Sequence, residues 1–371
     1  MDEIKNQETS VLTEEIETEA VANDGKDYIL EVDGLKQYFP VKKDMLGRPL
    51  AFLRAVDGVS FKLERGKTLG IVGESGCGKT TLGRTILRLY DPSEGTALYT
   101  AENENGERNT VDLARLSKRE LRGLRTQLQL VFQDPYSSLP PRMTVGAIIG
   151  EAVRVHKVVP DAEVSDYVRT VMRRCGLQEH HYDRYPHEFS GGQRQRICIA
   201  RALAVKPKLV ICDEPVSALD VSIQAQIINL LKQLQREEQM SYLFISHDLS
   251  VVKYISDSIA VMYLGNIVEM GSTADICTNA QHPYTQALFS AVPVANPHKK
   301  SNPESLEGEL PSPANPPKGC KFHTRCKHCT DRCREIPPSV TEVTPGHFVA
   351  CHLYGEQPCD EENTNEEKAE A

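Results

Sequence analysis

The sequence predicts an α/β fold in which helices cover a mostly parallel sheet and two turns of the chain bind phosphate. The glycine-rich stretch GESGCGKTT occupies Gly73–Thr81 and follows an apolar segment. A second turn of small residues lies within FSGGQRQR at Phe189–Arg196, where a helix is expected to begin. A four-residue apolar run then ends in Asp213 and Glu214. Glycines let backbone N–H groups surround phosphate oxygens, and a helix N-terminus attracts the same anion, so one chain is expected to carry two phosphate-binding surfaces.

The N-terminal part of the chain is expected to form strands that lead into the first phosphate loop. Strand-like segments occupy residues 28–32, 59–63 and 68–72. The last of them enters the glycine-rich loop and then a helix that starts near Lys79. This order predicts a strand–loop–helix unit.

Three further apolar runs are expected to complete the sheet. They lie at 128–132, 208–212 and 242–245, and their length and composition are typical of buried parallel strands. The polar residues that end or follow them are Gln133, Asp213 with Glu214, and Ser246 with His247. Because open α/β sheets bind ligands at the carboxyl ends of their strands, these side chains are expected to share one site.

The rest of the chain divides by composition. Residues 28–292 are expected to form the nucleotide-binding domain, in which the helical pattern of about 134–190 predicts an inserted lobe. Seven prolines fall between residues 293 and 317, so an extended linker is expected there. A small cysteine-rich module follows at 318–354.

The net charge is concentrated at the two ends of the chain. Residues 1–27 carry −7 and residues 355–371 carry −6 of the formal −9, which leaves +4 on the remainder. Both ends are expected to be disordered acidic tails, and the charge does not point to a nucleic-acid partner. No apolar run reaches the roughly 18 residues that span a bilayer, and the acidic N-terminus is unlike a secretory signal, so a soluble cytosolic protein is expected.

The motifs predict a site for ATP and Mg²⁺. Lys79 is expected to neutralise the β and γ phosphates, and Thr80, Asp213 and Gln133 are expected to hold Mg²⁺. The residues expected to surround the phosphates are Gly73, Glu74, Ser75, Gly76, Cys77, Gly78, Lys79, Thr80 and Thr81.

Three side chains are candidates for the hydrolytic step. Glu214 is expected to act as general base or to orient the attacking water, Gln133 to orient water, and His247 to bond the γ-phosphate. The alternative for each is structural: Asp213 and Glu214 as exposed carboxylates that cap a strand, Gln133 as a polar residue satisfied at a strand end, and His247 as a packing residue.

Residues 28 to about 290 resemble the nucleotide-binding subunits of ATP-binding cassette transporters. Six motifs of that family occur in its order: the phosphate loop, a glutamine loop at Gln133, the signature Ser190–Gln193, the acidic pair, SALD at Ser217–Asp220 and a switch histidine at His247. The resemblance implies a P-loop nucleotidase core with a RecA-like subdomain, an antiparallel β subdomain and an inserted helical subdomain.

The resemblance also implies how ATP is bound. In the family two subunits form a head-to-tail dimer, with two ATP molecules between the phosphate loop of one and the signature of the other. ATP binding closes that dimer and hydrolysis opens it. The implied contacts here are Ser190, Gly191, Gly192, Gln193 and Asp220. Family members also stack an aromatic ring on adenine; with no tryptophan in the chain, Phe39 is the expected residue and Tyr38 the alternative.

Three C-terminal stretches resemble the dipeptide and oligopeptide importer branch, close to the subunits whose names end in F. They are QHPYTQALFSAVP at 281–293, LEGELPSPANPPKGCKFHTRC at 306–326 and HFVACH at 347–352. The branch implies a second ATPase subunit, two membrane permease subunits and, indirectly, an external binding protein, at the cytoplasmic face of the membrane. A heterodimer of ATPase subunits is expected, with a homodimer as the alternative. It also includes nickel and glutathione uptake systems. Pro140 stands where the family commonly has asparagine, in the stretch that meets the membrane partner.

Five cysteines are crowded between Cys320 and Cys351. In a reducing compartment such a cluster predicts a metal site rather than disulfides. Zinc would use a CxxC pair, which Cys326 and Cys329 supply, whereas an iron–sulfur cluster accepts the wider spacing of Cys320, Cys326, Cys333 and Cys351. The family tail repeats those four without Cys329, so a [4Fe–4S] cluster is the expected group, with Zn²⁺ and no metal as the alternatives.

Two other functions compete with transport. A soluble cassette ATPase that remodels ribosomes or DNA usually carries two fused cassettes or a long coiled-coil insertion, and the sequence has neither. A metal-sensing regulator that only binds nucleotide would be expected to lack Glu214 or the signature, and both are intact.

Overall fold

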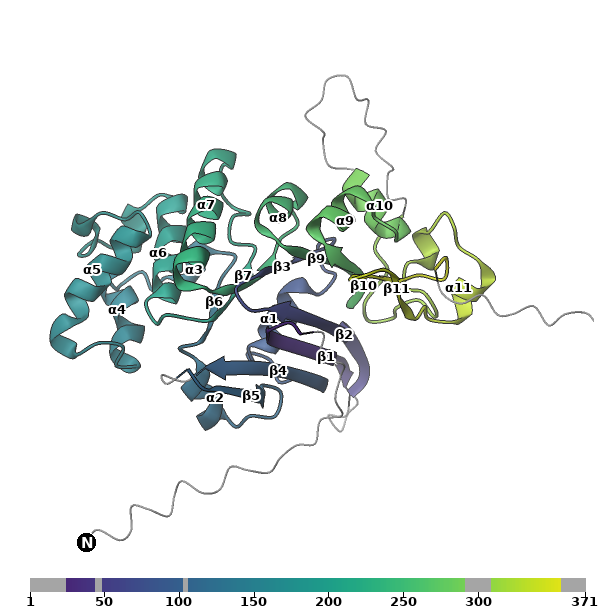
Figure 1. Cartoon of the computed structure of the whole chain (residues 1–371), viewed down its shortest axis with the longest axis horizontal. Coiled ribbons are helices and arrows are strands. Elements are labelled where there is room, and N and C mark those ends of the chain that lie inside the picture. The colour runs from purple at the N-terminus through teal and green to yellow at the C-terminus, as the bar shows by residue number, and fades with distance from the viewer. Residues whose placement is uncertain (1–24, 44–48, 103–105, 291–307, 355–371) are drawn as a thin grey trace, which may run out of the picture.

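The computed structural model describes residues 25–43, 49–102, 106–290 and 308–354. The two acidic tails lie almost entirely outside these residues, as does most of the proline-rich linker. Figure 1 shows a central sheet with a group of helices at one end, the cysteine-rich segment at the other and a smaller sheet beneath. The predicted α/β fold is confirmed. In the described part of the chain no helix is both long and apolar enough to cross a membrane.

The central sheet has eight strands in the order β11-β12-β10-β9-β3-β8-β7-β6. The strands from β9 to β6 are parallel, and β9, β10, β12 and β11 pair antiparallel in turn. Their bounds are β3 Thr68–Val72, β6 Leu128–Val131, β7 Leu209–Asp213, β8 Ser241–Ile245, β9 Ser258–Tyr263, β10 Asn266–Ser272, β11 Val340–Thr344 and β12 His347–Ala350.

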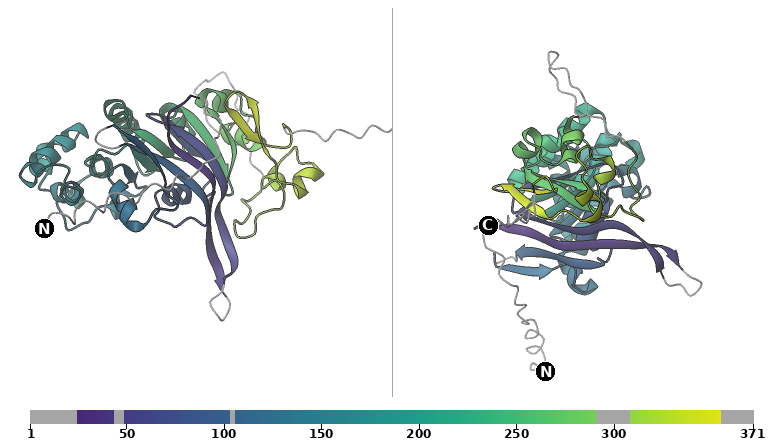
Figure 2. Two further views of the ribbon diagram at one scale, coloured as in Figure 1. Left: turned by 60° about the horizontal axis from the view of Figure 1, so that its bottom comes forward. Right: turned by 90° about the vertical axis from the view of Figure 1, so that its right-hand side faces the viewer.

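A second, antiparallel sheet has the order β2-β1-β4-β5. Its strands are β1 Tyr28–Lys43, β2 Pro49–Glu64, β4 Glu94–Glu102 and β5 Arg108–Asp112. The segments expected at 28–32 and 59–63 are therefore parts of two much longer strands. Figure 2 shows β1 and β2 as a long ribbon that projects beyond the body of the molecule.

Helices cover the central sheet and form the lobe at its end. The helices packed along the sheets are α1 Lys79–Ile86, α2 Lys118–Leu124, α7 Val221–Glu238, α8 Leu249–Ile255, α9 Thr273–Thr278 and α10 Pro283–Ser290. The lobe between β6 and β7 contains α3 Pro135–Ser138, α4 Val145–Val155, α5 Val164–Arg174 and α6 Gly191–Leu203, with short 3-10 turns at 161–163, 179–181 and 186–188. The cysteine-rich segment adds a 3-10 turn at 323–325 and α11 Asp331–Glu335.

Two hydrophobic cores lie on opposite faces of the central sheet. Successive strand residues point to opposite faces, so Val210 and Cys212 of β7 join the core beneath the helical lobe, α7 and α8. Leu209 and Ile211 join the other core, which α1 and the smaller sheet complete. The phosphate loop follows β3, and its glycines lie against β9 of the central sheet and β2 of the smaller one.

Candidate functional site

The phosphate loop connects β3 to α1. Gly73 and Gly78 have φ of 150° and 107°, in the region that favours glycine. A Cβ at Gly73 would lie 2.2 Å from the carbonyl oxygen of Met262, and one at Gly78 would lie 2.0 Å from that of Ala55. The backbone of the loop therefore approaches two neighbouring strands so closely that only glycine fits.

Lys79 lies across this loop. Its Nζ donates to the carbonyl oxygens of Gly73 at 2.8 Å and Glu74 at 2.9 Å, and its side chain is buried. Ser75 and Gly76 are exposed at the tip, where backbone N–H groups can meet phosphate oxygens.

Two other loop residues are placed beside the lysine. Cys77 is buried, and burial raises the pKa of its thiol. Thr81 lies in the first turn of α1, and its carbonyl oxygen accepts a hydrogen bond from Thr85.

Thr80 and Asp213 meet across the site. The Thr80 hydroxyl donates to Asp213 Oδ1 at 2.7 Å. Asp213 is 1% exposed, and among the described residues its Oδ2 has no hydrogen-bond partner, although Arg84 Nη2 lies 3.7 Å away. Burial raises the pKa of Asp213, against the opposing effects of Thr80 and Arg84. A hydroxyl beside a carboxylate with one unused oxygen fits a Mg²⁺ ion, which prefers such oxygen ligands.

The three hydrolytic candidates converge on one oxygen. Gln133 Nε2 donates to Glu214 Oε2 at 2.8 Å, and His247 Nδ1 lies 3.2 Å from the same atom. They follow β6, β7 and β8, as expected for the carboxyl ends of neighbouring parallel strands. Glu214 also has φ of 46°, a strained conformation of the kind that clusters at active sites.

The signature turn begins α6. Ser190 caps the helix: the Gln193 N–H donates to its hydroxyl at 3.4 Å, and the Ser190 N–H donates to Gln193 Oε1 at 3.1 Å. Gly191 and Gly192 form the first turn. Within the described residues no hydrogen bond or ion pair joins this turn to the phosphate loop, and Figure 1 places α6 in the helical lobe, away from α1.

Asp220 is exposed at the start of α7, beside the signature turn. Leu219, the residue before it, lies 3.4 Å from the position of a Cβ on Gly191. The turn predicted to be a second phosphate surface therefore lies on the lobe, and among the described residues it makes no hydrogen bond or ion pair with the phosphate loop of the same chain.

The two adenine candidates have different surroundings. The Phe39 ring meets Tyr90 edge-on with centroids 5.3 Å apart. The Tyr38 hydroxyl donates to Asp57, and burial, followed by this hydrogen bond, raises the pKa of Tyr38. Phe39 remains the predicted adenine contact, because its ring is not held by a hydrogen bond as the Tyr38 hydroxyl is.

Two residues that contact the phosphate loop were not predicted from the sequence. Arg325 donates to both carboxylate oxygens of Glu74, and the Glu74 N–H donates to the Tyr284 hydroxyl. They lie 251 and 210 residues after Glu74 in the chain. No motif or spacing gives a signal for contacts over such a separation.

The cysteine-rich segment surrounds a cavity of about 80 Å³. The cavity lining includes Cys320, Cys326, Cys333 and Cys351, but not Cys329. Burial, and then the three neighbouring thiols, raise the pKa of Cys320 to about 11. Among the described residues no group of three or more histidine, cysteine or carboxylate side chains has the geometry of a metal site.

Two family models match the chain. Residues 56–217 match the model described as ABC transporter, and residues 268–333 match the model described as oligopeptide/dipeptide transporter, C-terminal region.

Proteins of known name align along nearly their whole length. The oligopeptide transport ATP-binding protein AppF of Bacillus subtilis is 53% identical over 329 residues, which cover 88% of this chain and 97% of AppF. The dipeptide transport ATP-binding protein DppF of Haemophilus influenzae is 49% identical, and the match covers 87% of this chain and 96% of DppF. The oligopeptide transport ATP-binding protein OppF of the same organism is also 49% identical, with 89% and 98% covered.

Solved structures agree on the fold. The ATP-binding cassette MJ0796, in a dimeric post-hydrolysis state with ADP and Pi, superposes with a TM-score of 0.56 at 24% identity, covering 66% of this chain and 98% of that one. CbiO1 from Clostridium perfringens, part of the ABC transporter complex cbiONQ, superposes with a TM-score of 0.55 at 28% identity. The match covers 68% of this chain and 92% of CbiO1.

Proposed function

Because the chain belongs to the ATP-binding cassette family, in the branch of oligopeptide and dipeptide transporter ATPases, we propose that it energises peptide import through a membrane transporter. The chain is an ATPase, and ATP is its substrate. The observation that carries the ATPase role is the convergence of Gln133, Glu214 and His247 at the strand ends, near the contact of Thr80 with Asp213. Peptide as the transported substrate is supported by the relatives named oligopeptide and dipeptide transport ATP-binding proteins.

Each side chain has one task in hydrolysis. Lys79 and the backbone of the phosphate loop bind the β and γ phosphates, and Thr80 and Asp213 would hold Mg²⁺, which when bound spreads the charge of the phosphates. Glu214 Oε2 accepts a proton from the attacking water, while Gln133 orients that water. His247, whose Nδ1 lies beside Glu214 Oε2, is placed to form a hydrogen bond with the γ-phosphate.

The signature on the helical lobe gives this site its partner. Because Ser190–Gln193 does not reach the phosphate loop of its own chain, a second ATPase subunit supplies the opposing signature, and this chain supplies its own to that subunit. ATP then closes the dimer and hydrolysis opens it. We place the dimer, as a heterodimer, on two membrane permease subunits at the cytoplasmic face of the membrane, with an external binding protein acting indirectly.

The cysteines are proposed to hold a [4Fe–4S] cluster. Four thiols on one cavity are the donor set that an iron–sulfur cluster or Zn²⁺ uses. Cys320, Cys326, Cys333 and Cys351 would be the ligands, and the group would fasten a segment that has little core of its own. Zn²⁺, with Cys329 as a ligand, is the alternative.

Uptake by cells tests the transported substrate. A strain that lacks this subunit is complemented with the wild-type chain or with Glu214→Gln, and uptake of labelled dipeptide, oligopeptide, nickel and glutathione is compared. Peptide uptake restored only by the wild type supports the proposal. Restoration of nickel or glutathione uptake alone would assign the same ATPase to another member of the branch, and restoration of none would favour a non-transport role.

A further inference from the structure

The cysteine-rich segment forms an ion pair with the phosphate loop itself. Arg325 Nη1 and Nη2 donate to the two carboxylate oxygens of Glu74 at 2.7 and 3.0 Å. The Arg325 side chain is 5% exposed and that of Glu74 is 25% exposed. A two-pronged pair of this kind, shielded from water, fixes orientation as well as charge. Because the Glu74 N–H donates to Tyr284 and its carbonyl accepts from Lys79, the residue is held at three points.

The negative charge of Glu74 explains why its pair with Arg325 should affect ATP binding. Its carboxylate belongs to a loop that must receive the negative phosphates of ATP. Paired with Arg325, the carboxylate is neutralised and turned toward the cysteine-rich segment. Without the arginine, a free negative charge would remain beside the phosphates and would oppose their binding.

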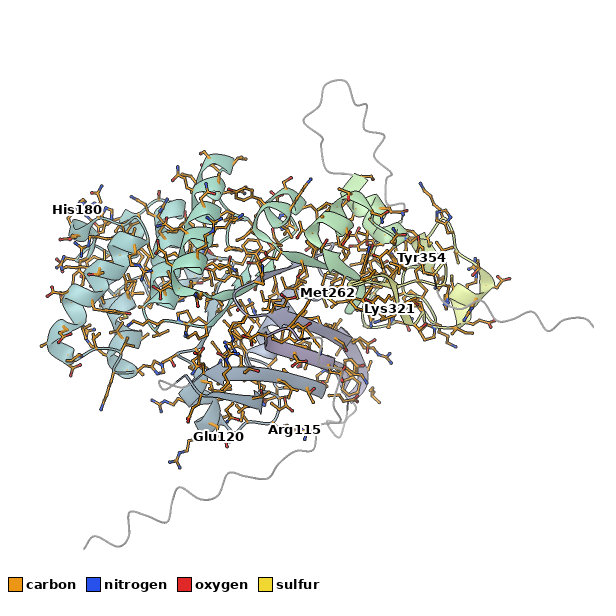
Figure 3. The ribbon with its side chains drawn as sticks, in the orientation of Figure 1. Arg115, Glu120, His180, Met262, Lys321 and Tyr354 are labelled. Atoms are coloured by element: carbon orange, nitrogen blue, oxygen red, sulfur yellow. The ribbon has the colours of Figure 1, made fainter. Side chains whose placement is uncertain are left out.

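The same segment makes a second contact with the nucleotide domain. Lys321 Nζ donates to Asp57 Oδ2 in β2 at 2.7 Å and to the Leu264 carbonyl at 2.9 Å. Figure 3 shows Lys321 where this segment meets the end of the central sheet. Lys321 directly follows Cys320, and Arg325 directly precedes Cys326. Two cations of this segment thus contact the nucleotide domain, one at the phosphate loop and one at β2 and the Leu264 carbonyl.

We propose that Arg325 is a positioning residue for the phosphate loop, through which the C-terminal segment raises the affinity for ATP. The inference rests on the proposed ATP site. Arg325 holds the Glu74 carboxylate at both oxygens, so the loop presents Lys79 and its backbone N–H groups to the phosphates without a competing negative charge.

Titration of the full chain with a fluorescent ATP analogue and Mg²⁺ tests the positioning role. Arg325→Gln is expected to weaken binding roughly five- to tenfold, and Arg325→Lys, which keeps the charge but not the fork, to recover part of that loss. In a Glu74→Gln background the arginine change is expected to have little effect, because no charge is left to neutralise. Arg334→Gln is the matched control, since that arginine forms only an exposed pair with Asp331. Unchanged affinity in Arg325→Gln, or additive effects of the two changes, would overturn the proposal.

The same titration separates this inference from the proposed function. The proposed function stays intact, whatever Arg325→Gln does, if the wild type binds the analogue and Lys79→Ala does not. A wild type that binds none would instead remove the ATP site on which the inference rests.

Discussion

The Thr80 hydroxyl donates a 2.7 Å hydrogen bond to Asp213, although 133 residues separate the two in the chain. The contact is possible because β3 and β7 both pair with β8, so the residues that end or follow them come to one edge of the sheet. It joins the loop proposed to bind phosphate to the strand that precedes Glu214, the proposed general base. In the proposed mechanism this contact fixes the place of Mg²⁺ relative to that of the attacking water.

Glu214→Gln should retain ATP binding and lose turnover. The amide keeps the size of the side chain but accepts no proton, so hydrolysis by the purified protein is expected to fall about 10²- to 10⁴-fold. When the variant is mixed with the second ATPase subunit and ATP, size-exclusion chromatography should show an accumulated dimer. Glu151→Gln, a change at an exposed residue of α4, is the control and should hydrolyse ATP normally. Unimpaired hydrolysis in the first variant would remove Glu214 from the mechanism.

Lys79→Ala should weaken ATP binding, the step that precedes hydrolysis. Removing the ammonium that bonds the Gly73 and Glu74 carbonyls leaves the loop without its central positive charge. ATP affinity, measured by titration calorimetry, is expected to fall by about tenfold or more. Lys67→Ala, a change at an exposed lysine outside the loop, should bind as the wild type does. Equal affinities for the two variants would contradict the assigned role.

Much of the site could be predicted from the sequence because each part of it is local. The phosphate loop, the signature turn and the acidic pair are short stretches whose chemistry needs particular residues at fixed spacing. Strand ends could be grouped because a parallel sheet brings them to one edge. That reasoning placed Gln133, Glu214 and His247 together, and the structure has them around one carboxylate oxygen.

The contacts of the C-terminal segment could not be predicted in the same way. Arg325 reaches Glu74 in a segment that packs on the central sheet, where the Phe322 ring contacts Tyr263 and β12 pairs with β10. The four-residue β12 gives a weak strand signal, and the partner of an arginine is not encoded by spacing. The lengths of β1 and β2 were also missed, because polar residues break their alternation and pairing with each other extends them.

The buried pair between β10 and β12 should be essential for stability. His347 Nε2 lies 2.7 Å from Glu269 Oε1, and both side chains are 0% exposed. His347→Ala would remove one of three hydrogen-bond partners of a buried carboxylate, which also accepts the Gln281 and His282 N–H groups, and is expected to cost about 1.5–3 kcal/mol in free energy of unfolding. Urea unfolding followed by circular dichroism measures the change. His187→Ala, at an exposed histidine, should stay within about 0.5 kcal/mol of the wild type.

Acid should destabilise the helical lobe through His181. Burial, followed by the neighbouring His180 and Arg184, lowers the pKa of His181 below the ordinary 6.5, and its Nδ1 accepts the Gln178 N–H. The folded state then binds fewer protons than the unfolded state, so this histidine's contribution is complete above pH 6.5 and declines as pH falls below it. His181→Asn should flatten the dependence of unfolding free energy on pH between about 7.5 and 5.5. An unchanged slope would show that other groups cause the loss.

Cysteine variants should decide which metal the C-terminal segment holds. In wild-type protein purified without oxygen, about four irons and matching sulfide per chain, with a broad visible absorption band, are expected for a [4Fe–4S] cluster. Cys326→Ser should release the metal and make residues 308–354 exchange amide hydrogens faster, because metal binding stabilises a segment with little core. Cys329→Ser separates the alternatives: it should leave an iron–sulfur cluster intact, since Cys329 does not line the cavity, but should empty a zinc site that uses the CxxC pair. Cys277→Ser, at a half-buried thiol outside the set, is the control. Unchanged metal content in Cys326→Ser would exclude Cys326 as a ligand, and one zinc lost in Cys329→Ser would replace the cluster by a structural zinc site.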